Sequence, residues 1–239
     1  MMIPPIIGAK VSASDHRSSN ITGEELIRLA TSARRAGLLS CTPGLVVIHM
    51  GDGRKGLEPI FYALEHSDLP PDKLLPTHMH RNHRLIDEGV ELVRRGGYID
   101  FTAGCDDQEL LKNADAVLYA LGQQGADLDH MTLSSDAYGS QPRFDENGKC
   151  IGLTYASPKY LHKTVQVLVK KGMPFEKAVR LLTTTPAYLL GKTGIKGCVA
   201  VNADADLLVL DDHLEIDGVF AKGKEALWHK ELKMKGTFE

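Results

Sequence analysis

The sequence predicts an α/β fold of the TIM type, a partial (β/α) barrel of about five β/α units with a small C-terminal β segment. Four short apolar runs each end in a side chain suited to chemistry, namely Lys10, His49, His78 or Asp136. Turn residues and then a helical pattern follow each run, as expected at the carboxyl ends of barrel strands. These residues lie 39, 29 and 58 positions apart, which corresponds to one, one and two barrel units of roughly 31 residues.

Five strands are expected, because a further apolar run fills the longest of these gaps. Short length and apolar character are typical of strands that are buried in a parallel sheet. The expected strands are IIGAK, LVVIH, LLPTH, GGYIDFTAG and MTLSSD, at 6–10, 45–49, 74–78, 96–104 and 131–136.

Helical patterns separate the expected strands. Thr22 and Glu25 form a T-x-x-E capping box, which predicts a helix over about 22–36 with Gly37 as its C-cap. Apolar periodicity predicts three further helices between the later strands. They cover GLEPIFYALEHS, RLIDEGVELVRRGG and DQELLKNADAVLYALGQQG, at 56–67, 84–97 and 107–125.

After Asp136 the pattern becomes less regular. We expect a long polar loop over 140–150, and then a helix over 159–172 with Ser157 as N-cap and Pro158 at its first position. Beyond about 195, turn residues and alternation replace helical periodicity. We therefore divide the chain into a partial barrel at 1–195 and a small β-rich appendage at 196–239.

Composition favours a small-molecule substrate. The 239-residue chain is 43% hydrophobic, with a formal charge of -3 and a pI near 6.4, which offers no electrostatic footprint for nucleic acid or an anionic membrane. No apolar stretch reaches the roughly 20 residues of a membrane span. The four cysteines form no CxxC pair and no signal peptide precedes them, so we expect a reducing, cytoplasmic setting.

The strand-end residues are suited to metal chemistry. Two neutral imidazoles and a carboxylate are ordinary zinc ligands, and such a site keeps a position open for an activated water. An ammonium cannot bind a cation, so Lys10 is either a surface residue or is altered, for example carbamylated into a group that bridges two metals. Structural alternatives stay open: core histidines at His49 and His78, and a turn cap at Asp136.

Several motifs together resemble one family. IGAKVSASDHRS, VVIHMGD, LLPTHMHRN, TLSSDAYGSQP, TVQVLVKKG, NADADLLVL and the final KGTFE occur in the order found in the isoaspartyl dipeptidases of the amidohydrolase superfamily. The resemblance runs through essentially the whole chain. It implies a metallo-dipeptidase, and so a metalloprotease, that holds two metals, usually zinc, and cleaves the β-aspartyl bond of isoaspartyl dipeptides. It also implies a large homo-oligomer.

The same resemblance assigns roles to the strand-end residues. Lys10 matches the carbamylated lysine that bridges the two metals, and His49 and His78 match the two ligands of one metal. Asp136 matches the carboxylate that binds the other metal and shuttles protons during attack and departure of the amine.

Three further residues match substrate contacts of the family. Arg17 in SDHRS and Arg81 in THMHRN match the binders of substrate carboxylates, a role that suits the two-pronged guanidinium. Ser140 in SDAYGS matches another substrate contact. His80 stands where the family usually has asparagine, so the His78-Met79-His80 sequence is not read as the family's first-strand H-x-H pair.

The chain departs from the family at its start. It begins about where the fourth barrel strand of the family would lie, so the H-x-H pair, the residues that grip the substrate amine and a carbonyl-polarising tyrosine are expected upstream. We expect at most one tightly held metal and little activity unless an upstream segment or a partner chain supplies the missing half. Two alternatives stay open: a non-catalytic remnant with one metal site, and a hydrolase of another N-acyl or cyclic amide.

Overall fold

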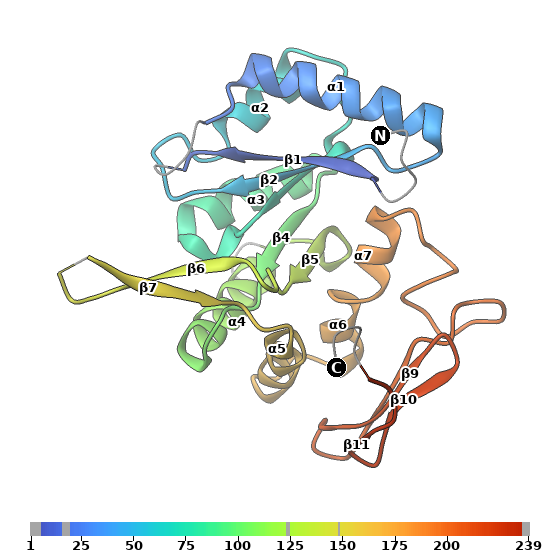
Figure 1. Cartoon of the computed structure of the whole chain (residues 1–239). Coiled ribbons are helices and arrows are strands. Elements are labelled where there is room, and N and C mark those ends of the chain that lie inside the picture. Colours follow the sequence, from blue (N-terminus) through green and yellow to red (C-terminus); the bar gives the residue numbers. More distant parts are fainter. Residues whose placement is uncertain (1–5, 16–19, 123–124, 148, 236–239) are drawn as a thin grey trace.

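The structure is a computed structural model that describes residues 6–15, 20–122, 125–147 and 149–235. Its first 134 positions alternate short strands with helices, and the helices lie on one side of the strands (Figure 1). The α/β prediction is thus confirmed. The strands are β1 (Gly8–Ala13), β2 (Leu45–Met50), β3 (Leu74–Thr77), β4 (Ile99–Thr102) and β5 (Met131–Ser134), and the helices are α1 (Gly23–Ser40), α2 (Glu58–Glu65), α3 (His83–Arg94) and α4 (Asp107–Gly122).

Backbone pairing joins these strands into two parallel sheets, β1-β2-β3 and β4-β5. In the first sheet Ser12, His49 and Thr77 lie level with one another, whereas Lys10 lies opposite Val47. Three single-turn 3-10 helices complete this part of the chain, η1 (Pro71–Lys73), η2 (Met79–Arg81) and η3 (Leu128–His130). The paired strands therefore run in one direction and bring their carboxyl ends to the same edge of each sheet.

Helix α1 shows how local signals set an element's start better than its end. Thr22 accepts a hydrogen bond from the Glu25 N–H, and the Glu25 carboxylate accepts one from the Thr22 N–H, which confirms the capping box. The predicted end at Gly37 is wrong, since the helix continues to Ser40 and closes at Cys41 in the left-handed conformation. Gly37 instead permits a close approach, because a Cβ there would lie 2.8 Å from the Gly44 backbone.

The main core lies between the strands and the helices. Ile99 and Phe101 of β4 are fully buried in it together with Leu26 of α1 and Val90 of α3. Alternate strand residues point to the opposite side. That side carries a small apolar cluster of Leu45, Leu75, Tyr98 and Leu189 and, nearer the carboxyl ends, the polar side chains described below.

The segment after β5 differs from its prediction. Where a polar loop was expected over 140–150, the chain forms an antiparallel hairpin of β6 (Ser140–Phe144) and β7 (Cys150–Tyr155) that projects from the body (Figure 1). The prediction of a loop over 140–150 is therefore wrong for the residues of the two strands.

The helix after the hairpin, α5 (Lys159–Lys170), has Pro158 as N-cap and no side-chain cap bond, so the predicted Ser157 cap is wrong by one residue. Two short helices follow, α6 (Phe175–Arg180) and α7 (Thr184–Leu189). Among the described residues, no helix combines the length and apolar character needed to cross a bilayer.

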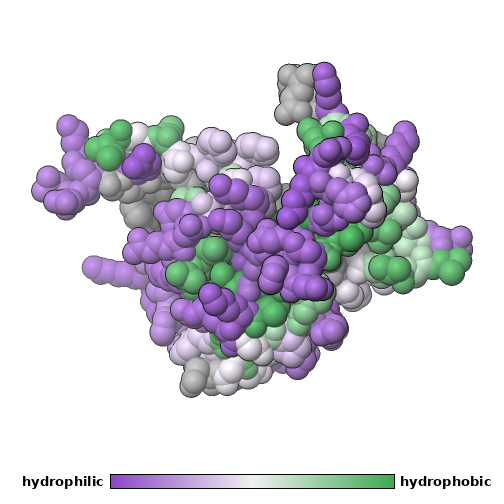
Figure 2. Space-filling model, turned by 90° about the horizontal axis from the view of Figure 1, so that it is seen from below, coloured by the Kyte–Doolittle hydropathy of each residue, from purple (hydrophilic) through white to green (hydrophobic). Residues whose placement is uncertain are grey.

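The last part of the chain is β-rich, as predicted. An antiparallel sheet in the order β11-β10-β9-β8 is built from β8 (Leu207–Leu210), β9 (Ile216–Ala221), β10 (Lys224–Trp228) and β11 (Glu231–Leu232). Edge strand β8 exposes apolar side chains, and Figure 2, seen from below, shows hydrophobic residues among hydrophilic ones on the side where this sheet lies.

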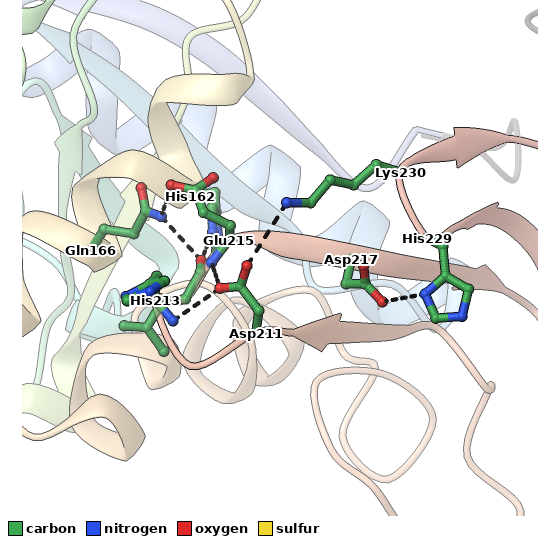
Figure 3. Close-up of polar contacts among 9 residues, drawn as sticks. His162, Gln166, Asp211, His213, Glu215, Asp217, His229 and Lys230 are labelled. Atoms are coloured by element: carbon green, nitrogen blue, oxygen red, sulfur yellow. Dashed lines mark hydrogen bonds and ion pairs between the residues drawn. The ribbon is translucent and has the colours of Figure 1, made fainter.

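Helix α5 anchors this sheet through the turn between β8 and β9 (Figure 3). The Leu214 carbonyl lies 2.6 Å from His162 Nε2 and accepts a hydrogen bond from the Gln166 amide at 3.0 Å. Asp211 closes the turn, since its carboxylate accepts from the N–H groups of His213 and Glu215. These contacts stabilise the turn.

Candidate active site at the strand ends

A polar cavity of about 210 Å³ lies at the carboxyl ends of β2, β3 and β5. The residues that line it include His49, His78, His80, Arg81 and Asp136. A larger cavity of about 350 Å³ lies near the amino-terminal ends of β1 and β2, beside Ile7 and Leu45. Barrel enzymes carry their chemistry at the carboxyl ends of strands, so the smaller and more polar cavity is the candidate site.

His78 is placed immediately after β3 by a left-handed backbone, with φ at 67°. Such a conformation is unfavourable outside glycine and is typical of functional positions. The side chain is 4% exposed, and its Nδ1 lies 2.7 Å from Thr102 Oγ1. Among the described residues its buried Nε2 has no hydrogen-bond partner, which is unusual for a buried polar atom.

The surroundings keep the His78 ring neutral. Burial, together with the nearby charges of His49, Arg81, His80 and Lys10, lowers the pKa of His78 to about 2, and burial has the largest effect. A metal ligand must be the neutral imidazole. The ring therefore offers an unprotonated nitrogen over the whole physiological pH range.

His49, in β2, lies directly beside His78, with ring centroids 4.4 Å apart. Its Nε2 lies 3.0 Å from the Asp15 carboxylate and 3.4 Å from Arg81 Nη2. A guanidinium only donates, so the Nε2 proton goes to the closer Asp15 oxygen. A carboxylate on one ring nitrogen orients a histidine and raises its basicity as a ligand through the other nitrogen.

The two imidazoles fit a divalent cation of the zinc type. They are adjacent, His78 is neutral and buried, and each ring has one nitrogen engaged by a neighbouring side chain. In the described ranges, no group of three or more His, Cys, Asp or Glu side chains has the geometry to hold a metal ion. The two imidazoles are thus a candidate pair of metal ligands.

The other predicted site residues are placed as follows. Asp136 lines the cavity just beyond β5, with a left-handed φ of 48°. Lys10 is exposed on β1 and does not line the cavity, although its charge contributes to the lowered pKa of His78. Ser140 begins β6, and Arg17 lies outside the described residues.

Arg81 follows His78 within η2 and reaches the cavity beside His49. His80 also lines it, and burial lowers the pKa of His80 to about 3, with the charges of Arg81 and Lys112 acting in the same direction. Both side chains are therefore available at the cavity wall, one as a fixed cation and the other as a neutral ring.

Sequence reasoning did not single out Asp15, Thr102 or Asp100. Asp15 is buried, 4% exposed, within the SDHRS motif, where Arg17 was singled out. Thr102 and Asp100 lie within an apolar run that was read solely as a strand. One signal was available: polar residues at alternate positions of a buried strand mark its inner face.

Asp100 forms a second polar centre beneath the site. Its carboxylate accepts hydrogen bonds from the hydroxyls of Thr77, Thr132 and Ser134. The pKa of Asp100 is raised to about 6, because burial outweighs the opposite effect of the three donors, and the nearby Asp136 charge acts in the same direction as burial.

Comparison with known proteins identifies similar folds. The model of the amidohydrolase family matches residues 55–226. A β-aspartyl dipeptidase from the thermophile Fervidobacterium islandicum AW-1, solved with the dipeptide β-Asp-Leu, is 35% identical, with a TM-score of 0.89. The match covers 98% of this chain and 60% of that one. A second structure of β-aspartyl dipeptidase from this bacterium is 32% identical over 99% of this chain and 60% of its own, with a TM-score of 0.85.

More distant structures share the fold alone. A D-hydantoinase from Thermus is 15% identical, with a TM-score of 0.61 over 95% of this chain and 65% of its own. The chain thus spans about 60% of the length of the two dipeptidase structures that it matches.

Proposed function

The chain belongs to the amidohydrolase family, and from that premise we propose that it forms the metal-binding half of a hydrolase that cleaves β-aspartyl dipeptides. The observation that carries the proposal is the buried Nε2 of His78, which has no hydrogen-bond partner among the described residues and lies beside His49. The similarity to a dipeptidase solved with β-Asp-Leu supports the substrate class.

In this proposal His49 and His78 hold a divalent metal, with zinc as the ordinary choice for imidazole ligands. The metal supplies polarisation of the scissile carbonyl and an activated water. Asp136, at the cavity wall, accepts a proton and returns it to the leaving amine. Arg81 binds a substrate carboxylate with its guanidinium, and we assign substrate contacts also to Arg17 and Ser140.

We further infer that β1 to β5 form consecutive units of one barrel, with a boundary near residue 195 before the β-rich segment. The remaining strands come from a further segment or a partner chain, since the matched relatives are longer than this chain. A homo-oligomer in the cytoplasm is the proposed setting. In its carbamylated form Lys10 would bridge to a second metal in the completed enzyme.

One observation favours a second candidate, a non-catalytic protein with a single metal site. Lys10 is exposed and does not line the cavity, so no bridge to a second metal is formed by the described residues. Under this candidate the chain binds one zinc and β-Asp-Leu without hydrolysing it at an appreciable rate.

The substrate class is tested by calorimetric titration of the zinc-loaded chain with β-Asp-Leu. A guanidinium–carboxylate contact contributes about 1.5–3 kcal/mol, so Arg81→Ala should weaken binding by about 10- to 150-fold. Arg84→Ala is the matched control, because Arg84 is exposed and pairs with Glu88 on α3.

The effect of Arg81→Ala on binding should require a carboxylate on the ligand. An analogue without a carboxylate should bind weakly and be indifferent to Arg81→Ala. Equal losses for β-Asp-Leu and the analogue would contradict the assignment. Turnover tests both candidates: rapid hydrolysis of β-Asp-Leu by the chain alone, with two zinc ions bound, would contradict both the single-metal site and the need for a completing segment.

A further inference from the structure

Asp100 occupies the inner side of β4 and is 4% exposed. Its neighbours Ile99 and Phe101 point the other way, into the core against the helices. Burial of a carboxylate is unfavourable, and an apolar side chain of similar size would avoid that cost. Packing alone therefore does not explain why an acid occupies this position.

Three hydroxyls from the flanking strands converge on this carboxylate. Thr77 Oγ1 lies 2.5 Å and Ser134 Oγ 2.6 Å from the same oxygen, Oδ2. Thr132 Oγ1 lies 2.7 Å from the other oxygen, Oδ1. Charge-assisted bonds of this kind are short and directional, so Asp100 fixes the relative positions of β3, β4 and β5.

Two of these three bonds lead toward the site. Thr77 immediately precedes His78, and Ser134 stands two residues before Asp136. Thr132 lies two residues further from the site along β5. Both residues that the bonds lead to have strained, left-handed backbones, which persist only when their surroundings hold them.

The link to β3 matters because backbone pairing does not provide it. Within the described ranges β3 pairs with β2 and β4 pairs with β5, and no ladder joins β3 to β4. Side chains cross this gap instead, Thr77 to Asp100 and His78 to Thr102. The strand end that carries His78 is thus held to β4 by the Asp100 and Thr102 side chains.

We propose that Asp100 is a positioning residue for the active site, which holds the metal ligand His78 through Thr77 and the proton carrier Asp136 through Ser134. The proposal rests on the metal site of the proposed function and not on its substrate. This role is distinct from a purely stabilising one. Removing any of the three hydroxyls removes one bond to the same carboxylate, but only Thr77 adjoins a metal ligand, so the three substitutions should change metal affinity unequally.

Three single variants of the full chain test this inequality: Thr77→Val, Ser134→Ala and Thr132→Val. Zinc affinity is measured by competition with a chelating dye, and urea midpoints report stability. Outer partners of metal ligands typically change affinity by about 10- to 100-fold. We expect about tenfold weaker zinc binding for Thr77→Val, which adjoins the ligand His78, and a change within about twofold for Ser134→Ala and Thr132→Val, with similar falls in urea midpoint for all three.

Equal zinc affinities across the three variants would overturn the proposal, as would failure of the parent chain to bind zinc. Asp100→Asn and Asp100→Leu give a second test. Asparagine preserves the shape and can bond to hydroxyls that rotate to accept, so it should retain affinity within a few fold, whereas leucine should lose tenfold or more. Equal affinities for these two variants would also overturn it.

The result is separable from the proposed function. Unequal zinc affinities together with no binding of β-Asp-Leu would support the positioning role and contradict the substrate class. Equal affinities together with binding of β-Asp-Leu that Arg81→Ala weakens would do the reverse.

Discussion

The substitution Asp100→Asn should make the stability of the chain less sensitive to pH. Burial raises the pKa of Asp100 to about 6 in the folded protein, from an ordinary value of 3.8. The folded state therefore holds this proton more tightly than the unfolded state. By linkage the contribution of Asp100 is most favourable below about pH 4, and it declines as pH rises through 6.

The size follows from the shift. Each pKa unit corresponds to about 1.4 kcal/mol, so a shift of about two units corresponds to about 3 kcal/mol between low and high pH. About half of that change falls between pH 5 and pH 8. Asparagine has the shape of protonated aspartate and does not titrate, so the variant loses only this part of the pH dependence.

The assay is urea unfolding of the parent and the variant at several values from pH 5 to pH 8, without metal. Subtracting the two free energies removes the titration of groups that both proteins share. We expect the variant to gain about 1–2 kcal/mol relative to the parent as pH rises over this range. A difference that is flat, or that moves in the opposite direction, would refute the argument that burial dominates at Asp100.

Three further substitutions test local features of the fold and site. Thr22→Ala should lower the free energy of unfolding by about 1 kcal/mol through loss of the capping box. The control Ser32→Ala, on the exposed face of α1, should change it by less than about half of that. Equal effects of the two substitutions would contradict the role of the cap. Phe101→Ala should cost about 3–5 kcal/mol in urea unfolding, since Phe101 is fully buried, and a loss under about 1 kcal/mol would show that its core is not packed as described. Thr102→Val should weaken zinc binding by about 10- to 100-fold, because His78 loses the partner that orients its ring; unchanged affinity would show that the ring needs no such partner.

The order of the strands could be predicted from the sequence because buried parallel strands are short apolar runs between helical patterns. The start of α1 was equally accessible, since Thr22 and Glu25 act on each other locally. The end of α1 could not be predicted in this way, because Gly37 permits a close approach to the Gly44 backbone and does not end the helix. The β6–β7 hairpin was missed for a related reason: its polar and turn residues hid two short strands.

The candidate site was also predictable only in part. His49, His78, Arg81 and Asp136 were predicted from their places after apolar runs or in motifs, and they line one cavity. The contacts of Asp15 and Asp100 were not predicted, because they depend on which side chains face these two residues across the strands. A position along one strand does not reveal that pairing. The binding of metal and substrate by these residues stays a prediction.

Metal content after the purified chain is loaded with zinc and dialysed tests most directly whether His49 and His78 hold a metal. We expect one zinc per protomer, lost in both His49→Ala and His78→Ala and retained in His130→Ala, whose ring bonds to the Gly97 carbonyl away from the cavity. A parent chain that retains no zinc, or variants at His49 and His78 that retain it fully, would contradict the claim that these two imidazoles hold a metal.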